Sequence, residues 1–176
     1  MRIVAVCLAG LAAAGVPAWA DDAADMRGAA QGFYGVYGTF HPSDGIPGDA
    51  DRARYRPFLS PALESLLAQA AAAQARFAAA NKGAPPLIEG DLFTSLFEGA
   101  TATTVGACRG DGAKGQCAVD LRHDDPGAQP TAWADTVYLV HTPQGWKIDD
   151  IGYGASWDFG NKGTLSGTLV QAIRFP

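Results

Sequence analysis

The sequence predicts an α+β fold in which N-terminal helices pack on a curved, cone-like antiparallel sheet. Apolar residues recur at spacings of three and four before residue 82, which is the helical period. From residue 101 to residue 153, β-branched and aromatic residues dominate and turn residues interrupt them, as expected for strands. Helices followed by a run of strands is the order typical of proteins whose helices cover one face of an antiparallel sheet.

The first twenty residues have the pattern of a secretory signal peptide. Arg2 precedes an apolar run from Ile3 to Val16, and Ala18-Trp19-Ala20 comes directly before two aspartates. We expect cleavage after Ala20, and the apolar run is too short to serve as a membrane span. The remaining residues, 21–176, are predicted to form a single domain of a periplasmic or secreted protein without a membrane anchor.

The charge of the chain argues against two classes of partner. The 176 residues carry a formal net charge of −5 and contain no run of Lys or Arg, whereas nucleic acids and anionic membranes are bound by basic surfaces. The sequence also lacks the G-x-S-x-G, H-E-x-x-H, P-loop and dinucleotide-binding motifs, so hydrolase, metalloprotease and nucleotide-binding activities have little support. We expect no nucleic-acid partner, no cofactor and no bound metal.

Two long helices are predicted before the sheet. The first runs from Asp25 to Phe40 and carries four glycines, for which close packing against the sheet would be the compensation. A Pro- and Gly-rich loop follows over 41–56. The second helix begins at Ser60 and Pro61, because serine is a favoured N-cap and proline a favoured first helical residue, and it ends near residue 81.

Two later segments differ in how clearly their pattern can be interpreted. For 87–99, the apolar pattern leaves open whether a short strand is followed by a helical turn. Leu165, Leu169 and Ile173 are spaced by four residues, which predicts a short final helix capped by Thr164.

Two hairpins are predicted to form the sheet. The first pairs 101–108 with 117–122, and a polar loop leads to the second, which covers 133–153. Cys108 and Cys117 lie in the first hairpin, and in an exported protein they are expected to form a disulfide just inside its tip. The eight residues between them do not match a C-x-x-C motif, which argues against a redox-active pair.

The second hairpin breaks the strand alternation at an acidic pair. Side chains alternate between faces along a strand, so Ile148 and Ile151 would point to opposite faces. A β-bulge at Asp149 and Asp150 would add one residue and return Ile151 to the face of Ile148. One aspartate could then point into the covered side, where a carboxylate needs an Arg, Lys, Tyr or backbone partner. The other interpretation places both aspartates at the rim of the sheet, in water.

Six short motifs carry a family resemblance. They are F-Y-x-x-Y at 33–37, L-S-P-x-L at 59–63, D-L-F at 91–93, W-x-D at 133–135, W-K-I-D-D-I-x-Y at 146–153 and G-N-x-G-T-L at 160–165. Together they resemble the exported bacterial family catalogued as domain of unknown function 3828. That family is similar to the nuclear-transport-factor-two-like superfamily, so the resemblance implies a cone of curved sheet and helices that often encloses a pocket. The resemblance implies no particular reaction.

Six aromatic residues are candidates for lining such a pocket, although the same residues would also serve a packed core. They are Tyr34, Tyr37, Trp133, Trp146, Tyr153 and Trp157. We expect an exported binding protein that holds a small apolar ligand inside the cone or binds another exported protein, as an inhibitor or immunity protein does.

The alternative function is that of a small lyase or isomerase. The superfamily resemblance implies a pocket aspartate, alone or with a histidine, as general base, and Asp149 or Asp150 would be that base here. His141 would complete an acid/base pair if it lay near them. The run His123-Asp124-Asp125 offers metal-ligating residue types, but adjacent residues rarely converge on one ion, so a solvated loop is the favoured interpretation.

Overall fold

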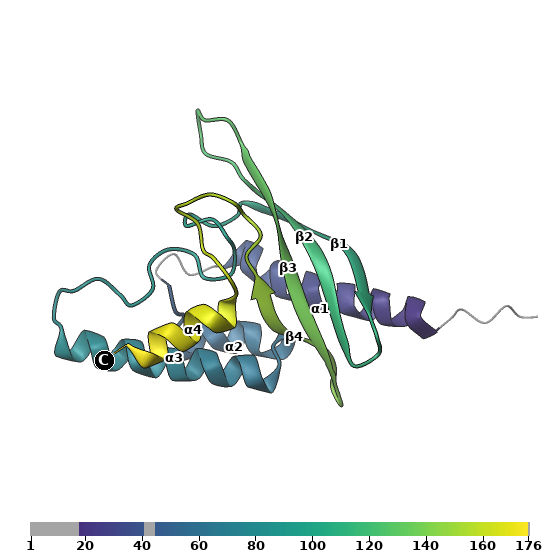
Figure 1. Ribbon diagram of the computed structural model, residues 1–176, viewed down its shortest axis with the longest axis horizontal. Helices are drawn as coiled ribbons and strands as arrows, with labels where there is room; N and C mark the ends of the chain where they lie inside the picture. Colours follow the sequence, from purple (N-terminus) through teal and green to yellow (C-terminus); the bar gives the residue numbers. More distant parts are fainter. Residues whose placement is uncertain (1–17, 41–44, 176) are drawn as a thin grey trace, which may run out of the picture.

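A computed structural model describes residues 18–40 and 45–175, which form an α+β fold (Figure 1). The elements are α1 (Ala18–Thr39), α2 (Asp49–Tyr55), a 3-10 turn η1 (Arg56–Phe58), α3 (Pro61–Ala80), β1 (Ala102–Gly110), β2 (Lys114–His123), β3 (Thr131–Thr142), β4 (Gly145–Gly152) and α4 (Leu165–Arg174). The strands form one antiparallel sheet in the order β1-β2-β3-β4. The predicted fold class is confirmed, whereas most of the predicted signal peptide lies outside the described residues.

The helices cover one face of the twisted sheet. Figure 1 shows α1 crossing behind the strands, while α2, α3 and α4 gather beside β4 and the β2–β3 hairpin projects beyond the helices. α1 turns Met26, Phe33 and Tyr37 toward the sheet, and all three are buried in the main hydrophobic core. Burial of each such side chain stabilises the fold by about 2 kcal/mol.

Both predicted helix caps are confirmed. The Ser60 hydroxyl accepts a hydrogen bond from the Leu63 N–H at 3.0 Å, at the start of α3. The Thr164 hydroxyl accepts one from the Gly167 N–H at 3.1 Å, at the start of α4. Each cap satisfies one of the amide groups that a helix N-terminus leaves without an intrahelical partner.

The acidic bulge is also confirmed. Tyr138 of β3 lies opposite Asp150, but the next residue, Leu139, lies opposite Ile148, so Asp149 is the extra residue. Ile148 and Ile151 are both fully buried on the covered face as a result. The bulge therefore preserves the apolar face of β4 across the acidic pair.

The two cysteines form the predicted disulfide. Cys108 of β1 and Cys117 of β2 are direct partners across the hairpin, and their sulfur atoms are bonded. Both lie on the side of the sheet that packs against the core.

Two local predictions are wrong, and a third question, which the sequence left open, is now settled. The segment 41–56, predicted as a loop, contains α2, which the buried ring of Tyr55 anchors to the core. Of the four glycines in α1, Gly32 alone has a close neighbour, and that neighbour is the ring of Phe58 in η1 rather than the sheet. The segment 87–99 forms neither a regular strand nor a helix.

Candidate functional site

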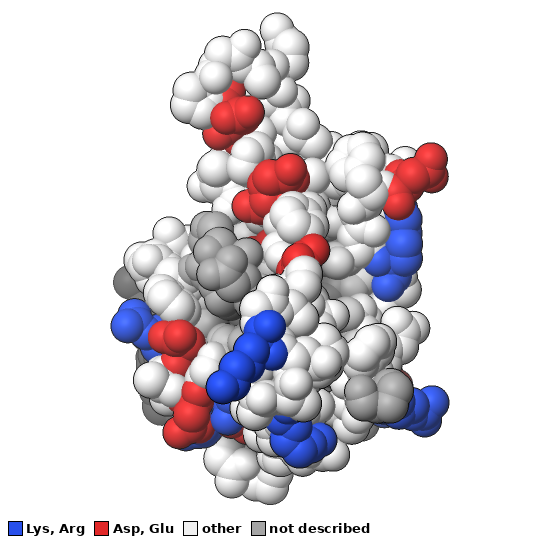
Figure 2. All heavy atoms as spheres, turned by 90° about the vertical axis from the view of Figure 1, so that its left-hand side faces the viewer, with Lys and Arg blue, Asp and Glu red and all other residues white. Residues whose placement is uncertain are grey.

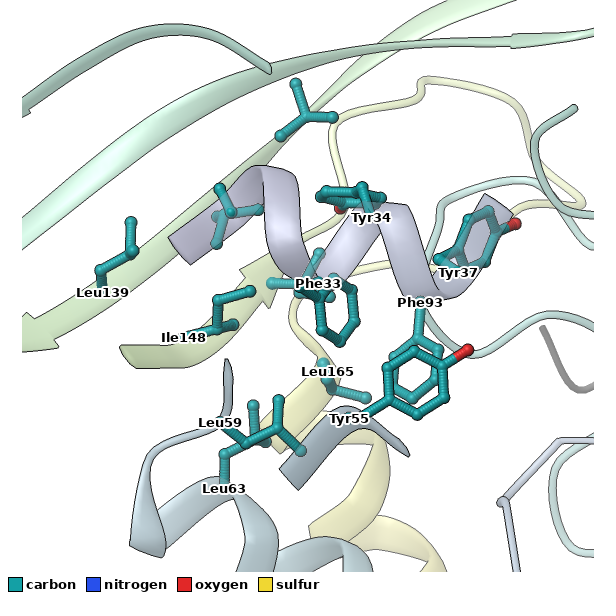
Figure 3. Close-up of a cluster of buried hydrophobic side chains, with 14 of the residues drawn as sticks. Phe33, Tyr34, Tyr37, Tyr55, Leu59, Leu63, Phe93, Leu139, Ile148 and Leu165 are labelled. Carbon is teal, nitrogen blue, oxygen red and sulfur yellow. The ribbon is translucent and has the colours of Figure 1, made fainter. Parts of the chain in front are cut away.

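Aromatic side chains fill the space between the sheet and the helices (Figure 3). The Phe33 ring contacts three neighbouring rings, with centroids 5.1 or 5.2 Å apart. Tyr34, Tyr37 and Tyr153, three of the predicted ligand-binding residues, are buried in this cluster. The packed-core interpretation therefore applies to these three residues.

The hydroxyl of Tyr34 stands out in this core because it has no hydrogen-bond partner among the described residues. Burial, followed by the charges of Asp135 and Asp91, raises the pKa of Tyr34 well above its ordinary value. The ring also borders an open cleft of about 310 Å³ between α1 and β1. A hydroxyl in this setting stays protonated, so it is unsuited to proton transfer near neutral pH.

Asp91 begins a buried irregular segment, 91–96. Its carboxyl accepts hydrogen bonds from the Tyr37 hydroxyl at 2.9 Å and the Phe93 N–H at 2.8 Å, while the Tyr37 oxygen accepts one from the Ala100 N–H. Burial outweighs these hydrogen bonds and raises the pKa of Asp91 to about 6. Such a pKa suits a general base, but Asp91 is only 2% exposed, so its geometry indicates a structural role.

Asp135 is a second buried carboxylate, and it joins three segments. One oxygen accepts hydrogen bonds from the Ser95 N–H at 2.9 Å and the Trp133 indole N–H at 3.2 Å. The other accepts from the Ser95 hydroxyl and from the Gly154 N–H at 2.8 Å. These four donors compensate for the loss of water around the carboxylate. They connect β3 with the 91–96 segment and with the loop that follows β4.

The predicted catalytic aspartates bind the first turns of two helices. Asp149 accepts a hydrogen bond from the Ser60 hydroxyl, at the start of α3, at 2.6 Å. Asp150 accepts from the N–H and the hydroxyl of Ser166, in the first turn of α4, at 2.9 and 2.5 Å. Carboxylates are stabilised at helix N-termini. Both aspartates are half-buried, and their partners tie the bulge of β4 to α3 and α4.

His141 is exposed and does not join the aspartates. It lies opposite Trp146 across β3 and β4, and the two rings meet edge to face at 5.1 Å. Asp149 lies three residues further along β4, about 10 Å away at the usual rise per residue. The predicted acid/base pair is therefore not brought together. Trp146 packs at this end of the sheet instead of lining a pocket.

An open cleft of about 280 Å³ lies where the β2–β3 loop faces the loop after β4. Its lining residues are Leu96, Glu98, His123, Asp125, Ala128, Gln129, Thr131, Trp157 and Phe159. Three segments that are far apart in the sequence contribute them, and we call this site the aromatic cleft.

Two aromatic rings form one wall of the aromatic cleft. Trp157 and Phe159 stack with centroids 5.9 Å apart and ring planes 4° from parallel, and Phe159 is 69% exposed. Trp133 packs edge to face on Trp157 at 5.5 Å, while its indole N–H is held by Asp135. Of the six predicted ligand-binding residues, Trp157 thus lines a cleft and Trp133 supports it.

The loop that carries this aromatic wall is anchored at several points. The Asn161 amide donates hydrogen bonds to the carbonyls of Asp91 and Thr94, at 2.8 and 2.7 Å. The Lys162 ammonium group donates to the carbonyl of Trp157. A binding surface held in place in this way loses less conformational entropy when it binds.

The cleft carries acidic side chains that no basic residue neutralises. Glu98 and Asp125 are exposed and have no ion-pair partner among the described residues, whereas Arg122 pairs with Asp124 at 2.6 Å. Figure 2 shows acidic and no basic side chains at the surface around the projecting tip on that side. His123 faces the Gly99 carbonyl with Nδ1, at 2.7 Å. A carbonyl only accepts hydrogen bonds, so Nδ1 carries the proton and Nε2 of the neutral ring is an acceptor.

Of the nine residues that line the cleft, sequence reasoning assigned only Trp157 to a ligand-binding site, and it considered His123 and Asp125 only as metal-ligating residue types. The local signal that could have indicated the aromatic cleft is the pair of aromatic residues Trp157 and Phe159, which lie in a loop with Gly, Asp and Asn. Neither a helix nor a strand requires large rings there, and exposed aromatic residues are enriched at binding surfaces.

Two negative observations apply to residues 18–40 and 45–175. In these ranges, no three His, Cys, Asp or Glu side chains are grouped so as to hold a metal ion. None of the helices there is both long enough and apolar enough to cross a membrane.

Comparisons with protein-family models, with curated proteins and with solved structures gave no match. The resemblance to domain of unknown function 3828 stays a prediction from the six motifs.

Proposed function

We propose that this protein is exported and binds another exported protein through its aromatic cleft. The observation that carries the proposal is the stacked wall of Trp157 and Phe159, which is open to solvent although the core beside it is filled. Aromatic side chains that remain exposed on an anchored loop are typical of protein interfaces, where they supply much of the binding energy.

The packed core favours this function over a small apolar ligand held inside the cone. Tyr34, Tyr37 and Tyr153 occupy the region where such a ligand would lie. The aromatic cleft, at about 280 Å³, lies just below the range of about 300–1,000 Å³ in which ligand pockets fall. A cleft of this size accommodates one side chain of a partner.

Two observations support export. The N-terminal twenty residues have the pattern of a signal peptide, and the disulfide between Cys108 and Cys117 is a bond that persists in oxidising compartments. We expect the mature protein to begin at Asp21, which mass spectrometry of the exported protein would measure directly.

Catalysis by a lyase or isomerase has less support. Asp149 and Asp150 are engaged with Ser60 and Ser166 at the helix starts, and Asp91 is closed off from solvent. A general base must reach the proton that it removes. The burial of Asp91 prevents this, and the serine hydroxyls already occupy carboxylate oxygens of Asp149 and Asp150.

The test uses the exported proteins of the native host and two forms of this protein. A partner retained by the immobilised wild type is identified, purified and recombined, and its dissociation constant is measured for the wild type and for the double variant Trp157→Ala/Phe159→Ala. We expect a defined stoichiometric complex that the double variant weakens by at least about a hundredfold, since two interface aromatics each contribute about 2 kcal/mol or more.

The matched control is Phe175→Ala, which removes an exposed aromatic residue directly after α4 that packs on Phe77 and does not line the cleft. Circular dichroism confirms that each variant is folded. Equal affinities for the wild type and the double variant would refute the proposal. So would failure to recover a stoichiometric partner, combined with stabilisation by an apolar small molecule.

A further inference from the structure

Resting on the proposed function, we infer that the partner inserts a lysine or arginine side chain into the aromatic cleft, over Trp157 and Phe159 and between Glu98 and Asp125. Four features of the cleft support this inference: the unpaired acids, the ring faces, the histidine acceptor and the size.

The acids of the cleft have no cation of their own. Glu98 and Asp125 line it without an ion-pair partner among the described residues. Among the described residues, Arg122 pairs with Asp124 at 2.6 Å and the Lys162 ammonium group donates to the carbonyls of Ala155 and Trp157, so neither cation pairs with Glu98 or Asp125. The cleft therefore presents negative charge that a cation from outside would neutralise.

The aromatic wall adds an attraction for the same kind of group. Phe159 is largely exposed and stacks parallel to Trp157, so the pair presents aromatic ring surface to solvent. A Lys or Arg side chain within about 6 Å of a ring face is attracted by the negative face of the π system. Its methylene groups would meanwhile cover apolar ring surface.

His123 favours a ligand group that donates hydrogen bonds over one that accepts them in the aromatic cleft. Its Nδ1 is committed to the Gly99 carbonyl, which leaves Nε2 of the neutral ring as an acceptor on a residue that lines the cleft. An ammonium or guanidinium group has only donors to offer, so it complements this acceptor as well as the two carboxylates.

The size of the cleft accommodates one long side chain of a partner. A volume of about 280 Å³ leaves room for the full length of a Lys or Arg side chain. The surrounding rim, with the β2–β3 loop on one side and the anchored loop after β4 on the other, is then available for the rest of the partner (Figure 1).

The test compares two short peptides, acetyl-Gly-Arg-Gly-amide and the same peptide with citrulline in place of arginine. Citrulline keeps the shape of arginine and lacks its charge. Titration into the full mature protein is followed by amide chemical shifts. We expect the arginine peptide to shift signals in 96–98, 123–131 and 157–159, and to bind at least about fivefold more tightly than the citrulline peptide.

The double variant Glu98→Gln/Asp125→Asn should remove this preference, and added salt should weaken it for the wild type. Asp120→Asn, which neutralises an exposed acid on the outer face of β2, should leave it unchanged. Equal binding of the two peptides, shifts confined to other residues, or no shifts with either peptide would overturn the inference.

Failure of the inference and failure of the proposed function are distinguishable. If the Trp157→Ala/Phe159→Ala variant weakens the purified complex but Glu98→Gln/Asp125→Asn does not, the partner binds at the cleft without a basic side chain. If neither double variant weakens the complex, the proposed function itself fails.

Discussion

Two pairs of carboxylates in this protein differ in what surrounds them. Asp91 and Asp135 are buried, and both accept several hydrogen bonds from the chain. Glu98 and Asp125 are exposed at the aromatic cleft and have no such partner among the described residues. A buried carboxylate needs internal donors, whereas water stabilises an exposed one until a ligand replaces it.

This difference in surroundings gives the buried carboxylates a supporting role and the exposed carboxylates a binding role. Asp135 holds the indole of Trp133, which packs on Trp157, so the buried acid helps to position the wall of the cleft. Asn161 extends the same support by tying the loop after β4 to the segment that begins at Asp91. The buried pair therefore stabilises the surface on which the exposed pair acts.

The largest expected effect is that of Asp135→Ala. The substitution leaves the Ser95 and Gly154 N–H groups and the Trp133 indole N–H without their acceptor. We expect a loss of at least about 3 kcal/mol in the free energy of unfolding, measured by urea denaturation. Asp120→Ala, at an exposed position on β2, is the control and should change it by less than about 0.5 kcal/mol. Equal effects would erase the distinction between buried and exposed acids.

The second effect concerns pH. The pKa of Asp91 rises from 3.8 to about 6 on folding. Between these values the unfolded chain releases the proton while the folded protein keeps it, so this residue's contribution to stability falls as pH rises and levels off above about 6. We expect the free energy of unfolding of the wild type, minus that of Asp91→Asn, to decrease by about 3 kcal/mol across this range. A difference that is independent of pH would contradict the assignment.

A smaller effect is expected for Asn161→Ala, which links the two regions. The variant removes two hydrogen bonds from the loop that carries the aromatic wall, and we expect it to cost about 2 kcal/mol. It should also increase the mobility of Trp157, which tryptophan fluorescence anisotropy would detect. Unchanged anisotropy would show that the loop does not depend on this anchor.

The smallest effect is expected for Glu98→Gln/Asp125→Asn. Because both side chains are exposed and unpaired, the double variant should change the free energy of unfolding by less than about 0.5 kcal/mol. Urea denaturation alongside Asp135→Ala provides the measurement. A loss comparable to that of Asp135→Ala would mean that these acids support the fold and are not reserved for binding.

Much of the fold could be predicted because its signals are local. Ser60 before Pro61 marks a helix start by capping chemistry alone. The broken alternation at Asp149 and Asp150 indicates a bulge, because only an extra residue keeps Ile148 and Ile151 on one face.

The site could not be predicted in the same way, because its residues meet only after folding. The partners of Asp149 and Asp150 are serines at helix starts elsewhere in the chain. The segment 91–96 is buried without a regular period, since its hydrogen bonds go to side chains such as Asp135. The requirement for glycine at position 160 also arises only after folding, because a Cβ there would lie 2.8 Å from the Ser95 carbonyl oxygen. Such contacts leave no repeating pattern in the sequence.

The most direct test of the central claim is site-specific photocrosslinking from two positions in the exported protein. A benzophenone side chain replaces Phe159 at the aromatic cleft in one form, and Tyr138 on the uncovered face of β3 in the other. The cleft position is expected to crosslink to the stoichiometric partner, and the sheet position is expected not to. Crosslinking to that partner from Tyr138 and not from Phe159 would contradict the account.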